Sequence, residues 1–161
     1  MADSAPPQPR FRIGVFAVIE RDGHYLLAHR SDIDWWNLPG GGLEYDETVE
    51  EGVAREVREE VGLAITIERL IGVYSKPRKH EVVLTFLCHP TAESPDPGTS
   101  EEVRASAWFL PTNLPPNLLP KHRQRLEDAL LARPAAILRA QTTTTEEDQQ
   151  LGPRDESTQV G

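Results

Sequence analysis

The feature that most constrains this chain is a glycine run followed closely by an acidic amphipathic segment. Residues 39–42 read Pro-Gly-Gly-Gly, and three adjacent glycines allow tight turning and a close backbone approach to a ligand. We therefore expect irregular structure there. In the segment 46–61 the apolar residues fall on one side at helical spacing, which predicts a helix with Asp46 as its N-cap and Gly62 at its end.

The segments around this helix predict an α/β fold. Apolar runs bounded by turn residues predict strands at 11–20, 24–30, 64–74, 81–88 and 103–110, and a second amphipathic helix is expected at 120–133. Arg21-Asp22-Gly23 is typical of a hairpin turn. The order of elements indicates a mixed sheet with helices packed on it and does not provide the repeated βαβ units of a Rossmann fold.

The 161 residues suffice for one domain with its own core. The proline-rich residues 1–9 are expected to be a mobile lead-in, and residues 10–140 form the domain. Residues 141–161 carry five acidic side chains and one basic side chain and lack apolar periodicity. This composition predicts a disordered acidic tail.

Composition excludes several classes of protein. Cys88 is the only cysteine, so no internal disulfide can form, and its apolar neighbours predict a buried side chain. No apolar run approaches the length of a membrane span, and the first residues do not resemble a signal peptide, so we expect a cytoplasmic protein without membrane contact. The net charge of -9 and the absence of a basic stripe argue against duplex nucleic acid as a partner.

Three acidic side chains of the expected helix share one stripe. Glu56, Glu59 and Glu60 are spaced i, i+3 and i+4, so their like charges oppose one another unless a cation lies between them. Carboxylate oxygens suit Mg²⁺, which keeps further positions for water or phosphate oxygens. The alternative is an ordinary surface helix in which Arg55 pairs with Glu51 and Glu59.

The surrounding residues distinguish these two interpretations. From Gly41 to Leu63 the chain matches, without departure, the pattern G-x5-E-x7-R-E-U-x-E-E-x-G-U, where U is a bulky aliphatic residue. This pattern defines the Nudix hydrolase family (MutT-like proteins), which the chain resembles. The resemblance implies an α/β/α sandwich with a mixed sheet. It also implies hydrolysis of a nucleoside diphosphate linked to some group X, with Mg²⁺ or Mn²⁺ as cofactor.

The resemblance also implies roles for individual residues. Glu56, Glu59 and Glu60 would ligate the metal together with the Gly40 carbonyl. Arg55 and Glu47 would orient these carboxylates, and Glu56 or Glu59 would act on the attacking water. In some members a glutamate from a later loop contributes, for which Glu101 and Glu102 are candidates and Glu102 is preferred. The expected catalytic residues are therefore Glu56, Glu59, Arg55 and Glu102.

Other residues are candidates for binding the substrate. Arg30 and the basic loop that contains Arg78 and Lys79 could hold phosphates, although ordinary solvated charge is the alternative for the loop. Trp35 and Trp36 could stack on a base, or they could be one core ring and one partly exposed ring.

The expected substrates are nucleoside di- and triphosphates, followed by ADP-ribose or another nucleotide sugar. The alternative outside enzymology is a Nudix-fold module that senses nucleotides. The expected assembly is a monomer or a homodimer.

Overall fold

The computed structural model describes residues 5–153. Within this part of the chain eight strands, three α-helices and one short 3-10 helix follow one another. In chain order they are β1 (Arg12–Arg21), β2 (His24–Arg30), β3 (Trp36–Asn37), β4 (Gly40–Gly42), α1 (Val49–Val61), β5 (Ile65–Lys76), η1 (Pro77–Lys79), β6 (Glu81–Pro90), β7 (Val103–Phe109), α2 (Pro120–Leu130), β8 (Ile137–Ala140) and α3 (Thr145–Gln150).

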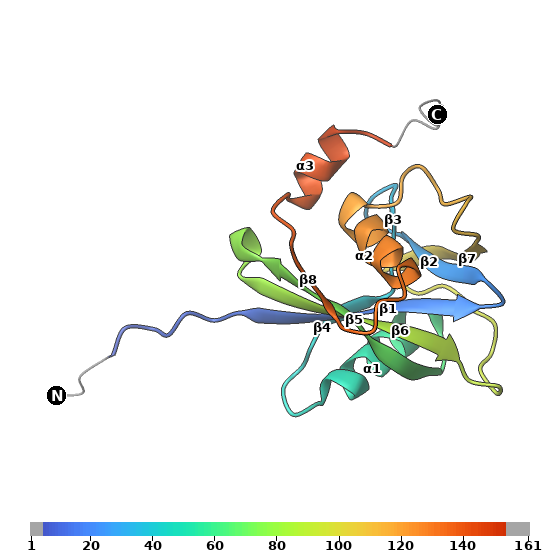
Figure 1. The fold of residues 1–161 in the computed structure, drawn as a ribbon, viewed down its shortest axis with the longest axis horizontal. Coiled ribbons are helices and arrows are strands. Elements are labelled where there is room, and N and C mark those ends of the chain that lie inside the picture. Colours follow the sequence, from blue (N-terminus) through green and yellow to red (C-terminus); the bar gives the residue numbers. More distant parts are fainter. Residues whose placement is uncertain (1–4, 154–161) are drawn as a thin grey trace.

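The strands form the mixed sheet that the sequence predicts (Figure 1). Their order is β3-β2-β1-β6-β5-β8, with β4 paired to β1 and β7 paired to β2. β1 runs parallel to β6 and β5 runs parallel to β8, whereas the other pairs are antiparallel. The hairpin between β1 and β2 turns at Asp22 and Gly23, whose φ angles of 51° and 75° are the positive values that a tight hairpin turn requires.

The two longer helices cover opposite faces of the sheet (Figure 1). Successive residues of β1 point to opposite faces, so Ile19 enters the core beneath α1 and Val18 enters the core beneath α2. α1 supplies Val53, Val57 and Val61 to the first core, and α2 supplies Leu126 and Ala129 to the second. This arrangement is the predicted α/β/α sandwich. Cys88 is buried in the first core, and burial raises the pKa of its thiol to about 12.

The predicted start of the first helix is wrong by two residues. Thr48, not Asp46, is the N-cap, and its hydroxyl accepts a hydrogen bond from the Glu51 backbone N–H at 3.1 Å. Asp46 instead has a φ of 64° in the preceding turn, so it cannot cap the helix. The predicted end is confirmed: Gly62 has a left-handed φ of 77° and donates its backbone N–H to the Arg58 carbonyl.

The glycine run is also more regular than predicted. Gly40–Gly42 form β4 and pair with residues 14–16 of β1. Glycine has low strand propensity, so only pairing with the long β1 strand stabilises this conformation. The strands β3 and β8 are short and were not predicted, since neither has a clear alternating pattern.

The end of the domain contradicts the prediction of a disordered tail for residues 141–150. Residues 141–150 pack against the domain and include α3, and Gln141 and Asp148 are buried. The contacts are mostly polar, which explains why apolar periodicity did not reveal them. Residues 154–161 of the predicted tail lie outside the described residues. In the predicted lead-in of residues 1–9, residues 5–9 are exposed and belong to no helix or strand, and residues 1–4 are not described.

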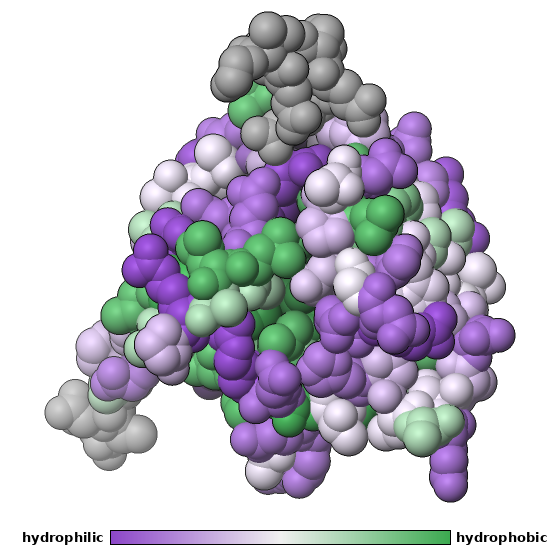
Figure 2. Space-filling model, turned by 45° about the vertical axis from the view of Figure 1, so that its right-hand side comes forward, coloured by the Kyte–Doolittle hydropathy of each residue, from purple (hydrophilic) through white to green (hydrophobic). Residues whose placement is uncertain are grey.

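The face shown in Figure 2 is mostly hydrophilic, with a smaller apolar area near its centre. Among the described residues Leu130, Leu131 and Leu138 are exposed around the end of α2 and β8. None of the helices in residues 5–153 combines the length and the hydrophobicity that crossing a membrane would require.

Candidate active site

Arg55 connects the acidic side chains of α1 to β4 (Gly40–Gly42), called here the glycine strand. Its Nε and Nη2 donate to Glu47 at 3.0 and 2.7 Å, and Nη1 donates to Glu56 at 3.0 Å and to Glu59 at 3.2 Å. Nη2 also donates to the Gly42 carbonyl oxygen at 3.0 Å. The Arg55 side chain is only 14% exposed, so water weakens these charge-assisted bonds little. This geometry agrees with the orienting role that the resemblance implies for Arg55 and Glu47.

Glu47, which pairs with Arg55 from outside the stripe, is charged at neutral pH. Hydrogen bonds from Arg55, and next the Glu44 backbone N–H at 2.8 Å, lower the pKa of Glu47 to about 2. The same pairing raises the pKa of Arg55. The Glu47–Arg55 pair is therefore a fixed ionic anchor at neutral pH, on which Glu56 and Glu59 are oriented.

Glu60 lies deepest in the stripe and contacts the glycine strand directly. Its Oε2 accepts a hydrogen bond from the Gly40 backbone N–H at 3.1 Å. Burial raises the pKa of Glu60 to about 8, and the charges of Glu56 and Glu102 act in the same direction. The pKa of Glu56 is also raised, mainly by burial. Burial thus disfavours the ionised forms of Glu56 and Glu60, and a cation beside them would favour these forms again.

Gly41 brings the backbone of β4 against Glu56. A methyl group on Gly41 would lie 2.6 Å from the Glu56 carboxyl carbon, which is too close for ordinary contact. The main chain of β4 therefore approaches the acidic stripe as closely as only glycine allows, which brings backbone carbonyls and carboxylates to one place.

This set of oxygen donors fits a hard divalent cation. Carboxylates and backbone carbonyls are the ligands that Mg²⁺ and related ions take, and burial raises the pKa of Glu56 and Glu60, a cost that a cation beside them would offset. In residues 5–153, however, no three acidic, histidine or cysteine side chains converge on one point. Glu56 and Glu59 instead turn to Arg55, and Glu60 turns to Gly40.

Glu102 comes from the loop before β7 and lines the same cavities as the acids of α1. It directly precedes β7, and its carbonyl oxygen accepts from the Ser31 backbone N–H at 2.9 Å, which holds it beside the end of β2. Its charge contributes to the raised pKa of both Glu56 and Glu60. Glu101 is its neighbour in the same loop, and both line the cavities described next.

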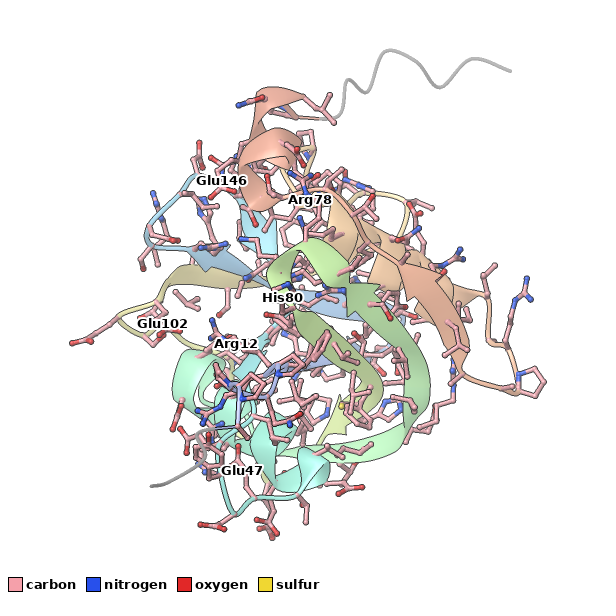
Figure 3. All side chains as sticks on the ribbon, turned by 90° about the vertical axis from the view of Figure 1, so that its left-hand side faces the viewer. Arg12, Glu47, Arg78, His80, Glu102 and Glu146 are labelled. Carbon is pink, nitrogen blue, oxygen red and sulfur yellow. The ribbon has the colours of Figure 1, made fainter. Side chains whose placement is uncertain are left out.

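Two adjoining cavities open beside the stripe. The first, of about 510 Å³, is lined by the glycine strand, the acids of α1 and the 100–102 loop. The second, of about 540 Å³, shares the glycine strand, Glu60 and Glu102 and extends to α2 and to Thr145 of α3. Figure 3 views this side: Glu47 lies at one end, Glu146 at the other, and Arg12 and Glu102 lie between them. Together the cavities are large enough for a nucleotide.

Of the basic residues predicted to bind the substrate, one lines the larger cavity and two line neither cavity. Arg30 lines the larger cavity, where Asp32 holds its guanidinium at 2.9 and 2.5 Å. Arg78 and Lys79 line neither cavity, and Arg78 pairs with Glu147 at 2.9 Å. Of the basic loop it is Lys76 that reaches the larger cavity.

The two tryptophans lie away from the acidic stripe. Trp35 is 7% exposed and borders a separate groove of about 300 Å³. Trp36 stacks on His29, with ring centroids 4.7 Å apart, and meets Phe109 edge-on. Neither ring lines the two cavities, and with Trp35 buried and Trp36 partly exposed their positions match the alternative of one core ring and one partly exposed ring.

Several residues of the larger cavity were not identified from the sequence, among them Arg12, Lys121 and His122. Arg12 lies two residues before Gly14 on β1, and the alternation of that strand places both on the cavity side, a signal that the sequence does contain. Lys121 and His122 come from the first turn of α2. The His122 Nδ1 accepts the Leu38 backbone N–H at 3.1 Å, and burial lowers the pKa of this imidazole, so it stays neutral.

Comparison with known proteins agrees with this site. Residues 8–130 match the model of the NUDIX domain. A MutT-like protein of Streptomyces ambofaciens is 39% identical over 127 residues, which are 78% of this chain and 81% of that protein. The nucleoside triphosphatase NudI of Escherichia coli O81 is 31% identical over 121 residues, which are 65% of this chain and 86% of that protein.

A solved structure has a similar fold. The crystal structure of an ADP-ribose pyrophosphatase from Streptococcus suis matches with a TM-score of 0.69 and 26% identity, over 81% of this chain and 98% of that one. The sheet order, the acidic stripe and these matches lead to one conclusion. The chain belongs to the Nudix family of hydrolases.

Proposed function

We propose that this protein hydrolyses the pyrophosphate linkage of nucleoside di- and triphosphates and related nucleoside diphosphate compounds, with Mg²⁺ or Mn²⁺ as the cofactor. Nudix hydrolases in general need divalent metal ions. One observation supports the proposal above the others. The carboxylates of Glu56, Glu59, Glu60 and Glu102 border one pair of cavities beside a glycine strand.

The chain's own residues have distinct tasks in such a reaction. Glu56, Glu59, Glu60 and the Gly40 carbonyl would hold the metal, which supplies neutralisation of phosphate oxygens and a more acidic bound water. Arg55 keeps Glu56 and Glu59 at the glycine strand through the hydrogen bonds described above. Glu56, Glu59 or Glu102 would accept the proton of the attacking water. Arg30, in the larger cavity, would hold a phosphate oxygen.

The first choice of substrate is a nucleoside di- or triphosphate. A relative that acts as a nucleoside triphosphatase supports this choice. ADP-ribose or another nucleotide sugar is the second, supported by the similar structure of an ADP-ribose pyrophosphatase. Arg78, Lys79, Trp35 and Trp36 are outside this proposal as substrate contacts, because none of them borders the cavities. We further propose a cytoplasmic monomer or homodimer.

The test is a phosphate-release screen over nucleoside diphosphates, triphosphates and nucleotide sugars with each metal. Glu59→Gln is the informative variant, because the Glu59 side chain is 57% exposed and its replacement should leave the fold intact. We expect turnover to fall by about a hundredfold or more with a near-native Tm. Glu50→Gln, at an exposed position on the same helix, is the matched control and should keep full activity. A wild-type protein that binds nucleotide tightly but releases no product with either metal would instead indicate a nucleotide sensor.

A further inference from the structure

Residues 141–150, called here the C-terminal segment, follow the part of the chain that matches the NUDIX domain, yet they pack against it. Arg78 donates to the Glu147 carboxylate at 2.9 Å and to the Thr142 carbonyl oxygen at 3.2 Å. The basic loop considered above as a phosphate clamp therefore binds the chain's own acidic segment. This contact alone is exposed and would contribute little to docking.

A buried ion pair fixes the segment more firmly. Lys121 Nζ lies 2.5 Å from Asp148, and the two side chains are only 6% and 2% exposed. Lys121 Nζ also donates to the Thr143 carbonyl oxygen at 3.1 Å. Separating such a pair while it stays buried is costly, so the segment and the first turn of α2 act as one unit. Lys121 also lines the larger cavity, so this unit is part of the cavity wall.

Gln141 fixes the other end of the segment. Its Oε1 accepts from Nε and Nη2 of Arg125 at 3.2 and 2.9 Å, and its Nε2 donates to the Lys121 carbonyl oxygen at 3.0 Å. Gln141 is 5% exposed and Arg125 is 1% exposed, so these bonds satisfy groups that water does not reach. The segment is thus held at both Gln141 and Asp148.

Thr145 lies between these two anchors and lines the larger cavity. The same cavity is bordered by Glu60 and the glycine strand, where the phosphates of a substrate would lie. In Figure 3 the Glu47 end of this face and the Glu146 end lie far apart, with Arg12 and Glu102 between them. A substrate with its phosphates at the acids of α1 would therefore extend toward Thr145.

We propose that the C-terminal segment is a wall of the substrate site and that Thr145 determines how far a bound substrate can extend along the cavity. This inference rests on the proposed function, because it assumes that the cavity takes a nucleotide. The wall favours compact substrates, such as nucleoside triphosphates, over those with a large group X. Thr145 is then a specificity-determining residue, whereas Lys121, Gln141 and Asp148 position the segment that carries it.

The test compares Thr145→Trp, which fills the cavity from this wall, with Thr143→Trp, which adds the same ring at an exposed position of the same segment. Kinetics on GTP, ADP-ribose and diadenosine tetraphosphate give kcat and KM separately. We expect Thr145→Trp to raise KM about tenfold for the longer substrates with kcat nearly unchanged, because a wall residue alters binding rather than the chemical step. Thr143→Trp should match the wild type.

Thr145→Ala tests the same inference if Thr145→Trp fails to fold, because it shortens the side chain and adds no bulk. It should increase kcat/KM for diadenosine tetraphosphate relative to GTP, and its Tm should stay near that of the wild type. Equal kinetics of the wild type, Thr145→Trp, Thr145→Ala and Thr143→Trp would overturn the inference while leaving the proposed function intact. A wild-type protein that cleaves none of the three compounds, nor any other in the screen, would overturn the proposed function itself.

Discussion

At the scale of single residues, the chemistry depends on what one guanidinium can do. Arg55 contacts two carboxylates of the stripe, the anchoring Glu47 and the Gly42 carbonyl at the same time. A planar group with five donors can do this, whereas a lysine ammonium has three donors at one point. The positions of Glu56 and Glu59 therefore depend on an arginine at this position and not merely on a positive charge.

Arg55→Lys should consequently reduce activity more than stability. We expect kcat/KM to fall about 10- to 100-fold, the usual consequence of removing a group that orients metal ligands. The Mn²⁺ concentration for half-maximal activity should rise, because the carboxylates are less well aligned. Arg58→Lys, at an exposed position of the same helix, is the control and should leave both quantities unchanged. An Arg55→Lys variant with wild-type metal dependence would contradict the orienting role.

Glu47 gives a prediction for pH. Its pKa is lowered from 4.5 to about 2 in the folded protein, so the folded state favours the ionised form. The stability that this pairing contributes is fully present above about pH 4.5 and is lost as the pH falls toward 2. Thermal unfolding should therefore show a Tm difference between the wild type and Glu47→Gln that is constant near neutral pH and shrinks in acid. A difference that is the same at pH 3 and pH 7 would contradict this prediction.

The residues of α1 were predictable from sequence because helical periodicity alone decides which side chains share a stripe. The spacing of Glu56, Glu59 and Glu60 placed them on one stripe, and the match to the Nudix pattern from Gly41 to Leu63 identified them as candidate metal ligands. Lys121 and His122 could not be found this way, since they reach the cavity only through the packing of α2 on the sheet. Trp36 was ambiguous for the same reason: its partner His29 is on a neighbouring strand.

At the scale of secondary-structure elements, the sequence predicted the long strands and helices well and the short ones poorly. Strands such as β2 have their own alternation and turn signals, so their bounds follow from local pattern. β4 consists of glycines alone, and its conformation comes from pairing with β1. The same pairing brings Gly41 against Glu56, so the element that local propensity predicted least well is the one that shapes the site.

The glycine strand can be tested with two neighbouring substitutions. Gly41→Ala puts a methyl group 2.6 Å from the Glu56 carboxyl group, which must move away. We expect activity to fall by about a hundredfold and stability to change little, because only the end of a flexible side chain is displaced. Gly42→Ala is the matched control: a methyl group there meets no atom within 4 Å among the described residues. Circular dichroism and kinetics of both variants distinguish a displaced carboxylate from a disrupted strand, and equal activities would contradict the account.

At the scale of the whole molecule, the site exists because the sandwich has two different faces. α1 and its acids lie on one face and α2 on the other, and β1 passes between the two cores. The larger cavity spans the edge where β4, the start of β1, the first turn of α2 and the C-terminal segment come together. The residue patterns predicted a mixed sheet with helices packed on it and the family resemblance implied the α/β/α sandwich, but the polar docking of the C-terminal segment has no periodic signal and was not predicted.

This docking predicts that the C-terminal segment contributes to stability. Deleting residues 141–161 removes Asp148 from Lys121 and Gln141 from Arg125, both of which are buried contacts. Leaving one charge of a buried ion pair without its partner typically lowers the free energy of unfolding by about 3–5 kcal/mol. Here the loss should be smaller, about 2 kcal/mol, because water reaches Lys121 once the segment is removed. For a chain of this length that corresponds to a Tm lower by about 4–8 °C.

Deleting only residues 154–161 is the matched control, because it leaves the contacts of Gln141 and Asp148 in place. If the contacts of residues 141–150 account for the effect, its Tm should stay within about 1 °C of the wild type. A second variant, Asp148→Asn, separates the ion pair from the rest of the segment. If the ion pair holds the segment in place, Asp148→Asn should lower the Tm by nearly as much as the long deletion. The loss should not be larger, because the segment can then detach and water can reach the unpaired Lys121. An unchanged Tm after the long deletion would show that the contacts of the C-terminal segment contribute nothing to the fold.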